Sequence, residues 1–280
     1  MNYYLPGMEP DFDIRQELRF IGGVLDLRQF DKIFISVSGG KDSQAMLFLM
    51  RDLAETQGAK DRLIAMYADT GMEWHNAESH VRTICAVADI PLQVVYPIRP
   101  MLEKFAHRIE LAKKGLINQN AFPSSTCRYC TSEQKVAPMD NFTRRFSGTL
   151  LKVTGERWQE SKARSTYPEF VKLKKLWTEN VASQNAQYRY RHVYGWRPML
   201  SFQTKDIFSM IENSGVPRHV CYDMGCERLG CAGCIFSGDK QTKIEMRENP
   251  KIFEAIDKLE TDSGHYLSMF GRPIRERIKK

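Results

Sequence analysis

The feature that most constrains the fold of this chain is a glycine-containing turn between a strand-like run and a helix-like run. Residues 32–37 (KIFISV) are mostly apolar and rich in β-branched side chains, as is typical of a buried parallel strand. The turn SGGKDS follows at residues 38–43, and residues 43–56 are predicted to form a helix. Because open α/β sheets bind ligands at the carboxyl ends of their strands, a ligand site is expected at this turn.

Strand-like and helix-like segments continue to alternate along the chain. After the turn, the pattern predicts a strand at 62–67, a helix at 76–88 and a strand at 92–96. It also predicts a strand at 148–154 and helices at 12–29, 101–117, 135–145, 202–214 and 245–261. Such alternation favours a parallel sheet with right-handed crossovers, so we expect an α/β protein with a doubly wound parallel sheet. We divide the chain into an α/β domain at 1–200, which carries the turn, and a small helical, Cys-rich C-terminal appendage at 201–280 that completes the site.

The composition excludes some classes of protein and is compatible with anionic partners. Hydrophobic residues make up 42% and charged residues 27% of the chain, and no apolar run approaches the ~20 residues that cross a bilayer. Residues 1–20 carry acids early and lack the apolar core of a signal peptide, so we expect a cytoplasmic protein with no membrane partner. The net charge of +7 suits nucleotides or nucleic acid as partners.

The turn at residues 38–43 has the chemistry of a phosphate-binding loop. Two glycines let the backbone turn tightly and bring its N–H groups close to an anion. These groups lie at a helix N-terminus, where the helix dipole also favours negative charge, and Lys41 can neutralise a phosphate. The turn matches neither the GxxxxGK[ST] nor the GxGxxG pattern. The alternative interpretation is an ordinary glycine turn capped by Asp42 or Ser43.

This hexapeptide resembles the pyrophosphate loop (PP-loop) of the adenine nucleotide α-hydrolase-like superfamily. Other segments resemble the phosphoadenylyl-sulfate reductase family within it: ADTGME at 68–73, CTSEQK at 130–135, GERWQESKAR at 155–164, RPML at 197–200 and GVP at 215–217. The resemblance covers about residues 30–238. It implies an adenine nucleotide α-hydrolase-like fold and an enzyme of sulfur metabolism that binds ATP or a sulfonucleotide.

The resemblance also implies roles for particular residues. It places the nucleotide against Ser38, Gly39, Gly40, Lys41, Asp42, Ser43 and Asp69. Arg157 and Arg164 become candidates for binding phosphate or sulfate, with Glu160 and Ser161 orienting their loop. The alternatives are a turn cap for Asp69 and a solvated surface pair for the two arginines. The candidate catalytic residues are therefore Lys41, Asp42, Arg157 and Arg164, with Mg²⁺ accompanying ATP near Asp42 and Asp69.

Six of the seven cysteines are clustered, which in a reducing compartment indicates metal binding or chemistry rather than disulfides. Cys85 lies apart, in a predicted helix with apolar neighbours, and is expected to be a core residue. Two CxxC pairs can together supply four thiolates: Cys127, Cys130, Cys231 and Cys234. An alternative set replaces the first pair with Cys221 and Cys226. The family resemblance implies a [4Fe–4S] cluster, and zinc is the alternative metal.

The reaction stays open between three interpretations. A phosphoadenylyl-sulfate reductase needs a nucleophilic cysteine on a C-terminal tail, and no cysteine follows Cys234. SGGKDS, paired CxxC motifs and the missing tail cysteine instead resemble the ATP pyrophosphatase of bacterial DNA phosphorothioation systems, for which a cysteine desulfurase is the expected sulfur donor. The other interpretations are a sulfonucleotide reductase that uses Cys221 or Cys226, and a non-catalytic module that binds nucleotide or nucleic acid.

A basic and aromatic tract spans residues 168–198. KLKKLW at 172–177 and YRYRHVYGWR at 188–197 interleave cations with rings, which can contact phosphates and stack on bases of DNA or RNA. We interpret the tract as an inserted hairpin or a mobile loop. The alternative to nucleic-acid binding is a solvated loop with a few packed aromatic side chains.

Overall fold

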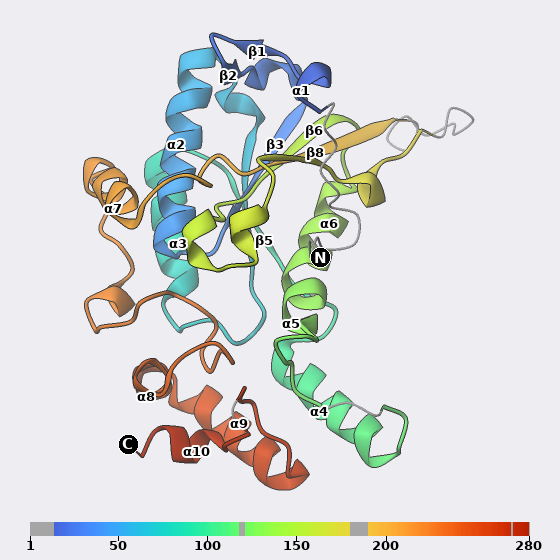
Figure 1. The fold of residues 1–280 in the computed structure, drawn as a ribbon, viewed down its shortest axis with the longest axis vertical. Coiled ribbons are helices and arrows are strands. Elements are labelled where there is room, and N and C mark those ends of the chain that lie inside the picture. The colour runs from blue at the N-terminus through green and yellow to red at the C-terminus, as the bar shows by residue number, and fades with distance from the viewer. Residues whose placement is uncertain (1–13, 118–120, 180–189, 270, 280) are drawn as a thin grey trace. The chain divides into compact units, whose positions relative to one another are not determined.

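The described strands form a large, mostly parallel β-sheet (Figure 1). The structure is a computed structural model that describes residues 14–117, 121–179, 190–269 and 271–279. Within these residues the large sheet has six strands in the order β5-β4-β3-β6-β8-β7. In chain order they are β3 (Lys32–Val37), β4 (Leu63–Ala68), β5 (Leu92–Val95), β6 (Gly148–Val153), β7 (Phe170–Lys172) and β8 (Arg191–Trp196).

The strand order reverses at β3, which makes the sheet doubly wound. β3 pairs in parallel with β4 on one side and with β6 on the other, and β6 pairs in parallel with β8. β7 is antiparallel to β8 and forms one edge. A reversal of strand order opens a ligand crevice at the carboxyl ends of the strands, and here it falls between β3 and β6. The expected fold class is confirmed.

Helices cover both faces of this sheet. α2 (Lys41–Gln57) and α7 (Thr204–Asn213) lie on one side and α6 (Ala137–Thr143) on the other (Figure 1). The ring of Phe34 on β3 packs edge-on against Phe142 and Phe146, whose rings lie 6.0 and 5.1 Å away. On the other face, the Gln44 amide donates to the backbone oxygen of Val216 at 3.1 Å. The β3 residues Ile33, Phe34, Ile35 and Val37 are at most 2% exposed, so the strand is buried on both faces, as its run of apolar residues predicts.

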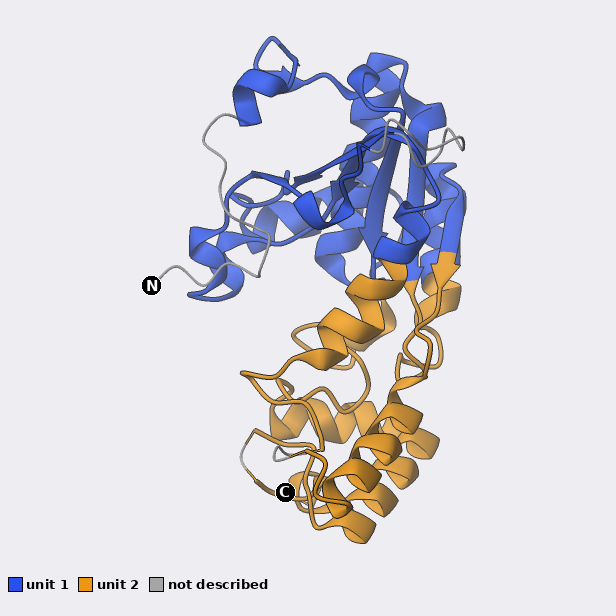
Figure 2. Ribbon diagram, turned by 90° about the vertical axis from the view of Figure 1, so that its right-hand side faces the viewer, with its two compact units in different colours: residues 1–67, 81–93, 140–218 blue, residues 68–80, 94–139, 219–280 orange. Residues whose placement is uncertain are grey.

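The chain forms two compact units that interleave along the sequence (Figure 2). Unit 1 comprises residues 1–67, 81–93 and 140–218, and unit 2 comprises residues 68–80, 94–139 and 219–280. The sequence analysis divided the chain once, near residue 200, and that division stays a prediction.

Unit 2 is built mostly of helices around an apolar core. They are α4 (Met101–Lys113), α5 (Tyr129–Thr131), a π-helix (Ser132–Val136), α8 (Asp239–Glu248), α9 (Pro250–Ser263) and α10 (Ile274–Arg277). Their core includes Phe105, Phe122 and Ile256, each at most 1% exposed. Across the part of the chain that the structure describes, no helix combines the length and apolar character needed to cross a membrane.

Two of the predicted helices are wrong. In place of one helix over 12–29, α1 (Ile14–Glu17) is followed by a hairpin of β1 (Phe20–Ile21) and β2 (Val24–Leu25) and by a 3₁₀ turn; residues 12 and 13 lie outside the described part. Gly22 and Gly23 have φ of 58° and 81°, so the backbone reverses where the apolar spacing predicted helix. The helix predicted over 245–261 is interrupted, because α8 ends at Glu248 and α9 begins at Pro250.

The remaining elements agree with the predictions to within a few residues, with one refinement. The helix predicted at 135–145 begins as the π-helix and continues as α6. The tract at 168–198 contributes β7 and β8, which pair in antiparallel fashion as the predicted hairpin. Residues 180–189 lie outside the described part, and they include Tyr188 and Arg189, the first two residues of the motif at 188–197.

Glu260 in α9 gives unit 2 a predicted pH dependence. Its carboxylate, 1% exposed, accepts the backbone N–H groups of Leu267 at 2.7 Å and Ile274 at 2.6 Å. Burial raises the pKa of Glu260 above its ordinary 4.5, and the two N–H donors only partly offset this. The folded state therefore keeps the proton to a higher pH than the unfolded chain, so the free energy of unfolding falls as the pH rises above 4.5.

Glu260→Gln removes this titration while keeping an oxygen that can accept a hydrogen bond. Urea unfolding from roughly pH 4 to 8 is expected to show a weaker loss of stability in this variant than in the wild type. The exposed Glu276→Gln is the control, and its pH profile should match that of the wild type. Parallel profiles for Glu260→Gln and the wild type would contradict the assignment.

Candidate functional site

The turn at residues 38–43 joins β3 to α2 in unit 1. Gly39 has a φ of 75°, in the left-handed region that favours glycine, and Gly40 is the N-cap of α2. Because the N-cap has no side chain, it cannot accept a hydrogen bond from the first turn of the helix. A phosphate oxygen can accept there, where the helix dipole is also positive.

Two serines fix the shape of this loop. The Ser43 hydroxyl donates to the Gly40 carbonyl at 2.9 Å and accepts the backbone N–H of Ser38 at 3.1 Å. The hydroxyls of Ser38 and Ser43 also lie 3.1 Å apart. These hydrogen bonds within the loop hold its backbone in one conformation before a ligand binds.

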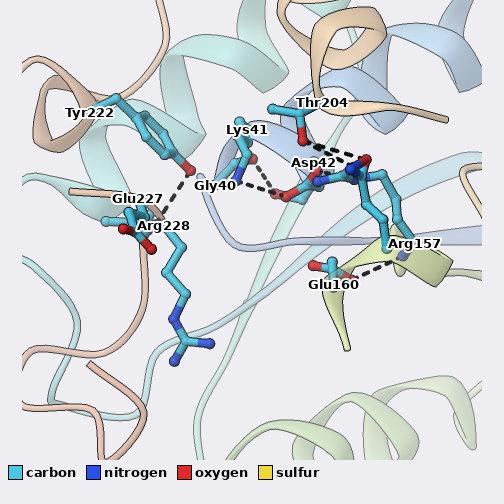
Figure 3. Close-up of polar contacts among 12 residues, drawn as sticks. Gly40, Lys41, Asp42, Arg157, Glu160, Thr204, Tyr222, Glu227 and Arg228 are labelled. Atoms are coloured by element: carbon cyan, nitrogen blue, oxygen red, sulfur yellow. Dashed lines mark hydrogen bonds and ion pairs between the residues drawn. The ribbon is translucent and has the colours of Figure 1, made fainter. Parts of the chain in front are cut away.

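Asp42 lies between two cations (Figure 3). The Arg157 Nε donates to Asp42 Oδ1 at 2.6 Å, and Lys41 Nζ lies 3.4 Å from Asp42 Oδ2. The Arg157 guanidinium, 3% exposed, also donates to Gln159, to the Phe202 carbonyl at 3.2 Å and to Thr204 at 3.4 Å. These contacts occupy Arg157, so it positions Asp42 and the loop rather than presenting a free fork to an anion. Whether Asp42 contacts the Mg²⁺ that accompanies ATP stays a prediction.

The segment after β6 continues this chain of contacts. The Arg157 N–H donates to Glu160 at 2.9 Å, and the same Glu160 oxygen pairs with Arg164. Burial alone would lower the pKa of Arg164, but the neighbouring Glu160 carboxylate outweighs burial and raises the pKa above its ordinary value. The structure therefore links Asp42, Arg157, Glu160 and Arg164 through consecutive hydrogen bonds and ion pairs.

Gly155 and Thr204 are two members of this site to which the sequence analysis gave no role. A Cβ at Gly155 would lie 3.3 Å from the Asp42 carbonyl oxygen, so a side chain there would press on the loop. Gly155 opens the motif GERWQESKAR, which was a signal for it. Thr204 has no comparable signal, because only the fold brings α7 to Arg157.

Asp69 belongs to unit 2 and forms a turn. Its Oδ1 accepts the backbone N–H of Gly71 at 2.8 Å, and its own N–H donates to the Val95 carbonyl at 3.0 Å. This is the turn cap that the sequence analysis kept as an alternative. Its role toward a nucleotide stays a prediction.

Glu73, Lys135 and Cys231 come together in unit 2. Lys135 Nζ lies 3.2 Å from Glu73 Oε1, and the Cys231 thiol donates to the same oxygen at 3.4 Å. Burial raises the pKa of Cys231 to about 12. Burial alone would lower the pKa of Lys135, but Cys231 and Glu73 outweigh it and raise the pKa. Glu73 is the last residue of the ADTGME motif, and Lys135 is the last residue of the CTSEQK motif. The sequence analysis did not predict that their side chains would be in contact.

Six of the seven cysteines fall into two groups in unit 2, and the buried Cys85 lies apart from them in unit 1. Cys127, Cys130 and Cys231 pack against the core formed by α4, α9 and α10, and Cys234 accepts a hydrogen bond from Arg228 at 3.1 Å. Cys221 and Cys226 instead pack with Trp74 and Ala77 in a separate apolar cluster. Among the described residues, no three His, Cys, Asp or Glu side chains converge closely enough to hold a metal ion. The four thiols of the CxxC pairs have the donor chemistry of an iron–sulfur or zinc site, but they are not gathered into one.

A buried acid supports the second CxxC loop. Glu245, fully buried in α8, accepts the Gly233 N–H at 3.1 Å and the Ser237 hydroxyl at 2.8 Å. Gln241 donates to Glu245 at 2.7 Å and to the Arg228 carbonyl at 3.1 Å. These bonds fix the backbone of residues 228–237, which carries Cys231 and Cys234.

A doubly wound sheet with a glycine loop between its central strand and the next helix defines an α/β protein with an anion-binding loop at a helix N-terminus. Residues 32–236 match the phosphoadenosine phosphosulfate reductase domain. The chain belongs to the phosphoadenosine phosphosulfate reductase family.

The individual proteins that resemble this chain share little sequence identity with it. A 37.8 kDa uncharacterized protein of Escherichia phage 186 is 27% identical, with 72% of this chain matched, and the chain spans only 66% of that relative's length. The phosphoadenylyl-sulfate reductase of Candida auris, solved with phosphate, aligns with 73% of this chain and 83% of its own at 14% identity and a TM-score of 0.44. The U34-tRNA thiolase of Methanococcus maripaludis, solved with its [4Fe–4S] cluster, aligns with 90% and 72% at 14% identity and a TM-score of 0.39.

Proposed function

We propose that this protein is an ATP pyrophosphatase that transfers an adenylyl group for the incorporation of sulfur into nucleic acid. The observation that carries the proposal is the SGGKDS loop at the N-terminus of α2, with Lys41 and the Asp42–Arg157 ion pair beside it. Family membership supports adenine nucleotide binding.

The proposed reaction breaks the bond between the α- and β-phosphates. An acceptor oxygen attacks the α-phosphorus and pyrophosphate leaves with the bonding electrons. The terminal sulfur of a persulfide, on a donor such as a cysteine desulfurase, later displaces AMP, and a second thiol then cleaves the S–S bond and leaves the donor as a disulfide. The loop N–H groups and Lys41 would stabilise the negative charge that develops on pyrophosphate. Arg157 acts as a positioning residue, because it fixes Asp42 and through it the first turn of α2. The Mg²⁺ that accompanies ATP is part of the substrate.

A second candidate function is the reduction of a sulfonucleotide, which the family match favours. It needs a thiolate that attacks the sulfur of the bound nucleotide. Burial raises the pKa of Cys226 to about 11, and Cys221 is fully buried, so neither is a ready nucleophile in this structure. This argument places the reductase second.

The test is one anaerobic preparation assayed with two substrates. With ATP, Mg²⁺ and a nucleic-acid acceptor the proposal expects pyrophosphate release, and with a sulfonucleotide and a thiol donor it expects no sulfite. Sulfite without pyrophosphate would replace the proposal with the reductase. Nucleotide binding without either product would leave a binding module.

We further propose that Cys127, Cys130, Cys231 and Cys234 hold a [4Fe–4S] cluster, which would supply a site for sulfur when bound. Anaerobically purified protein is expected to contain about four irons per chain and a brown chromophore. Cys231→Ser and Cys234→Ser should lose the iron, whereas Cys221→Ser and Cys226→Ser should keep it. Colourless protein with stoichiometric zinc would contradict the iron assignment, and iron loss in Cys221→Ser would favour the alternative ligand set.

A further inference from the structure

Two arginines of unit 2 lie over the same aromatic ring. The guanidinium carbon of Arg128 is 5.0 Å from the centroid of the Phe236 ring, and that of Arg228 is 5.7 Å from the same centroid. Arg128 lies inside the first CxxC motif, and Phe236 follows the second motif by two residues. The ring therefore joins the two CxxC segments and brings both guanidinium groups to one place, no farther apart than the sum of these two distances.

The positive charge of both arginines is available to a partner. Arg128 and Arg228 are exposed, and among the residues that the structure describes neither forms an ion pair with an acid. The Arg228 side chain extends away from the carboxylate of the adjacent Glu227 (Figure 3). The acids on the neighbouring segments are engaged elsewhere: Glu133 with Lys104, Asp239 with Arg272, and Glu245 with Gln241. Two exposed cations thus attract an anionic partner to this part of unit 2.

The contacts of the two guanidinium groups hold them without using up their donors. Arg128 Nη2 donates to the Thr131 hydroxyl at 3.2 Å, and Arg228 Nη2 donates to the Cys234 sulfur at 3.1 Å. A guanidinium has five N–H donors in one plane, so each group keeps donors for a further acceptor. This planar fork matches two oxygens of a phosphate group. Because the ring and these bonds already order both side chains, a partner gains the contacts at a low entropic cost.

We propose that Arg128 and Arg228, held by Phe236, bind the phosphate backbone of the nucleic-acid acceptor beside the second CxxC loop. An exposed arginine gains little from a single carboxylate or phosphate ion, because water screens the charge. A nucleic-acid strand adds the release of its condensed counterions at every phosphate contact, so the pair favours a strand over a small anion or an acidic peptide. The inference rests on the proposed function for the class of acceptor, and it adds the residues of unit 2 that hold it.

The test measures binding without ATP. The anisotropy of labelled DNA and RNA strands of about 20 nucleotides is followed with the anaerobically purified full chain at roughly 50–200 mM salt. Arg128→Ala with Arg228→Ala should weaken binding of the preferred strand by about tenfold or more near 0.1 M salt. The slope of log affinity against log salt should fall by about 1.4, because two phosphate contacts are lost. Arg128→Ala alone, which leaves the contact of Arg228 with Cys234 in place, should lower the slope by about 0.7.

Two matched variants separate these arginines from general charge and from damage to the fold. Lys113→Ala with Lys114→Ala removes two exposed cations at the end of α4 and should leave affinity and slope unchanged. Arg128→Lys with Arg228→Lys keeps both charges and should retain the slope. Equal losses in either variant and in the double alanine variant would overturn the proposal. So would binding of neither strand, or displacement of the strand by inorganic phosphate or polyglutamate as readily as by unlabelled strand. Pyrophosphate release is measured separately, so a failed ATP assay leaves this result intact.

Discussion

Lys41→Ala is expected to lower kcat/KM for pyrophosphate release from ATP by about a hundredfold or more. The Lys41 ammonium stands at the first position of α2, beside the N–H groups that would hold the departing pyrophosphate. Loss of one preorganised group that stabilises charge in the transition state typically costs about 10²–10³ in rate. The measurement is steady-state release of pyrophosphate with Mg²⁺ at saturating and limiting ATP.

Two further variants show whether Lys41 acts on the substrate or only on the loop. Lys60→Ala removes another lysine of unit 1, one that pairs with Glu55, and should keep full activity. Asp42→Asn weakens the contact with Arg157 and should also reduce activity strongly, because the first turn of α2 loses its anchor. Full activity in Lys41→Ala would remove the loop from the chemistry, whatever the other variants do.

Asp140→Ala is expected to lower the free energy of unfolding by about 3–5 kcal/mol, the typical cost of leaving a buried charge without its partner. Asp140 and Lys152 are 4% and 7% exposed, and their charged atoms lie 2.5 Å apart. Burial lowers the pKa of Lys152. Burial alone would raise the pKa of Asp140, but the ammonium of Lys152 outweighs it and holds the pKa below its ordinary value. Urea unfolding at neutral pH measures the change.

A double replacement distinguishes the loss of the Asp140–Lys152 ion pair from the loss of side-chain volume. Asp140→Leu with Lys152→Met removes both charges and keeps much of the side-chain volume, so it should recover most of the stability lost in Asp140→Ala. Arg275→Ala breaks an exposed pair with Asp257 and should cost less than about 1 kcal/mol. If the double variant is as unstable as Asp140→Ala, the ion pair is not the cause.

The sequence predicted the sheet because its signals are local. The run at 32–37 is a strand with those bounds, since consecutive apolar, β-branched residues suit a strand buried on both faces. The prediction of one helix over 12–29 was wrong because the apolar residues follow a helical spacing only up to Gly22 and Gly23. There the backbone is left-handed and the chain reverses direction. Pro250 likewise starts a new helix within a continuous apolar pattern.

The candidate site was predictable in its residues but not in its contacts. The glycine loop and the segment at 155–164 were found as motifs, each within one stretch of chain. The partnership of Asp42 with Arg157 joins positions 115 apart, and only the pairing of β3 with β6 creates it. The same holds for Glu73 with Cys231, 158 positions apart, and for Arg191 with Arg144, because no local pattern encodes such contacts.

The pairing of β3 with β6 also bears on how the protein is made. Thr149, at the start of β6, lies 118 positions after Asp31, which directly precedes β3. During synthesis the hydrogen-bonding edge of β3 that meets β6 emerges from the ribosome long before its partner exists, and unpaired apolar strands invite aggregation. A chaperone that shields the nascent chain should therefore raise the yield of folded protein more than a change in the final buffer.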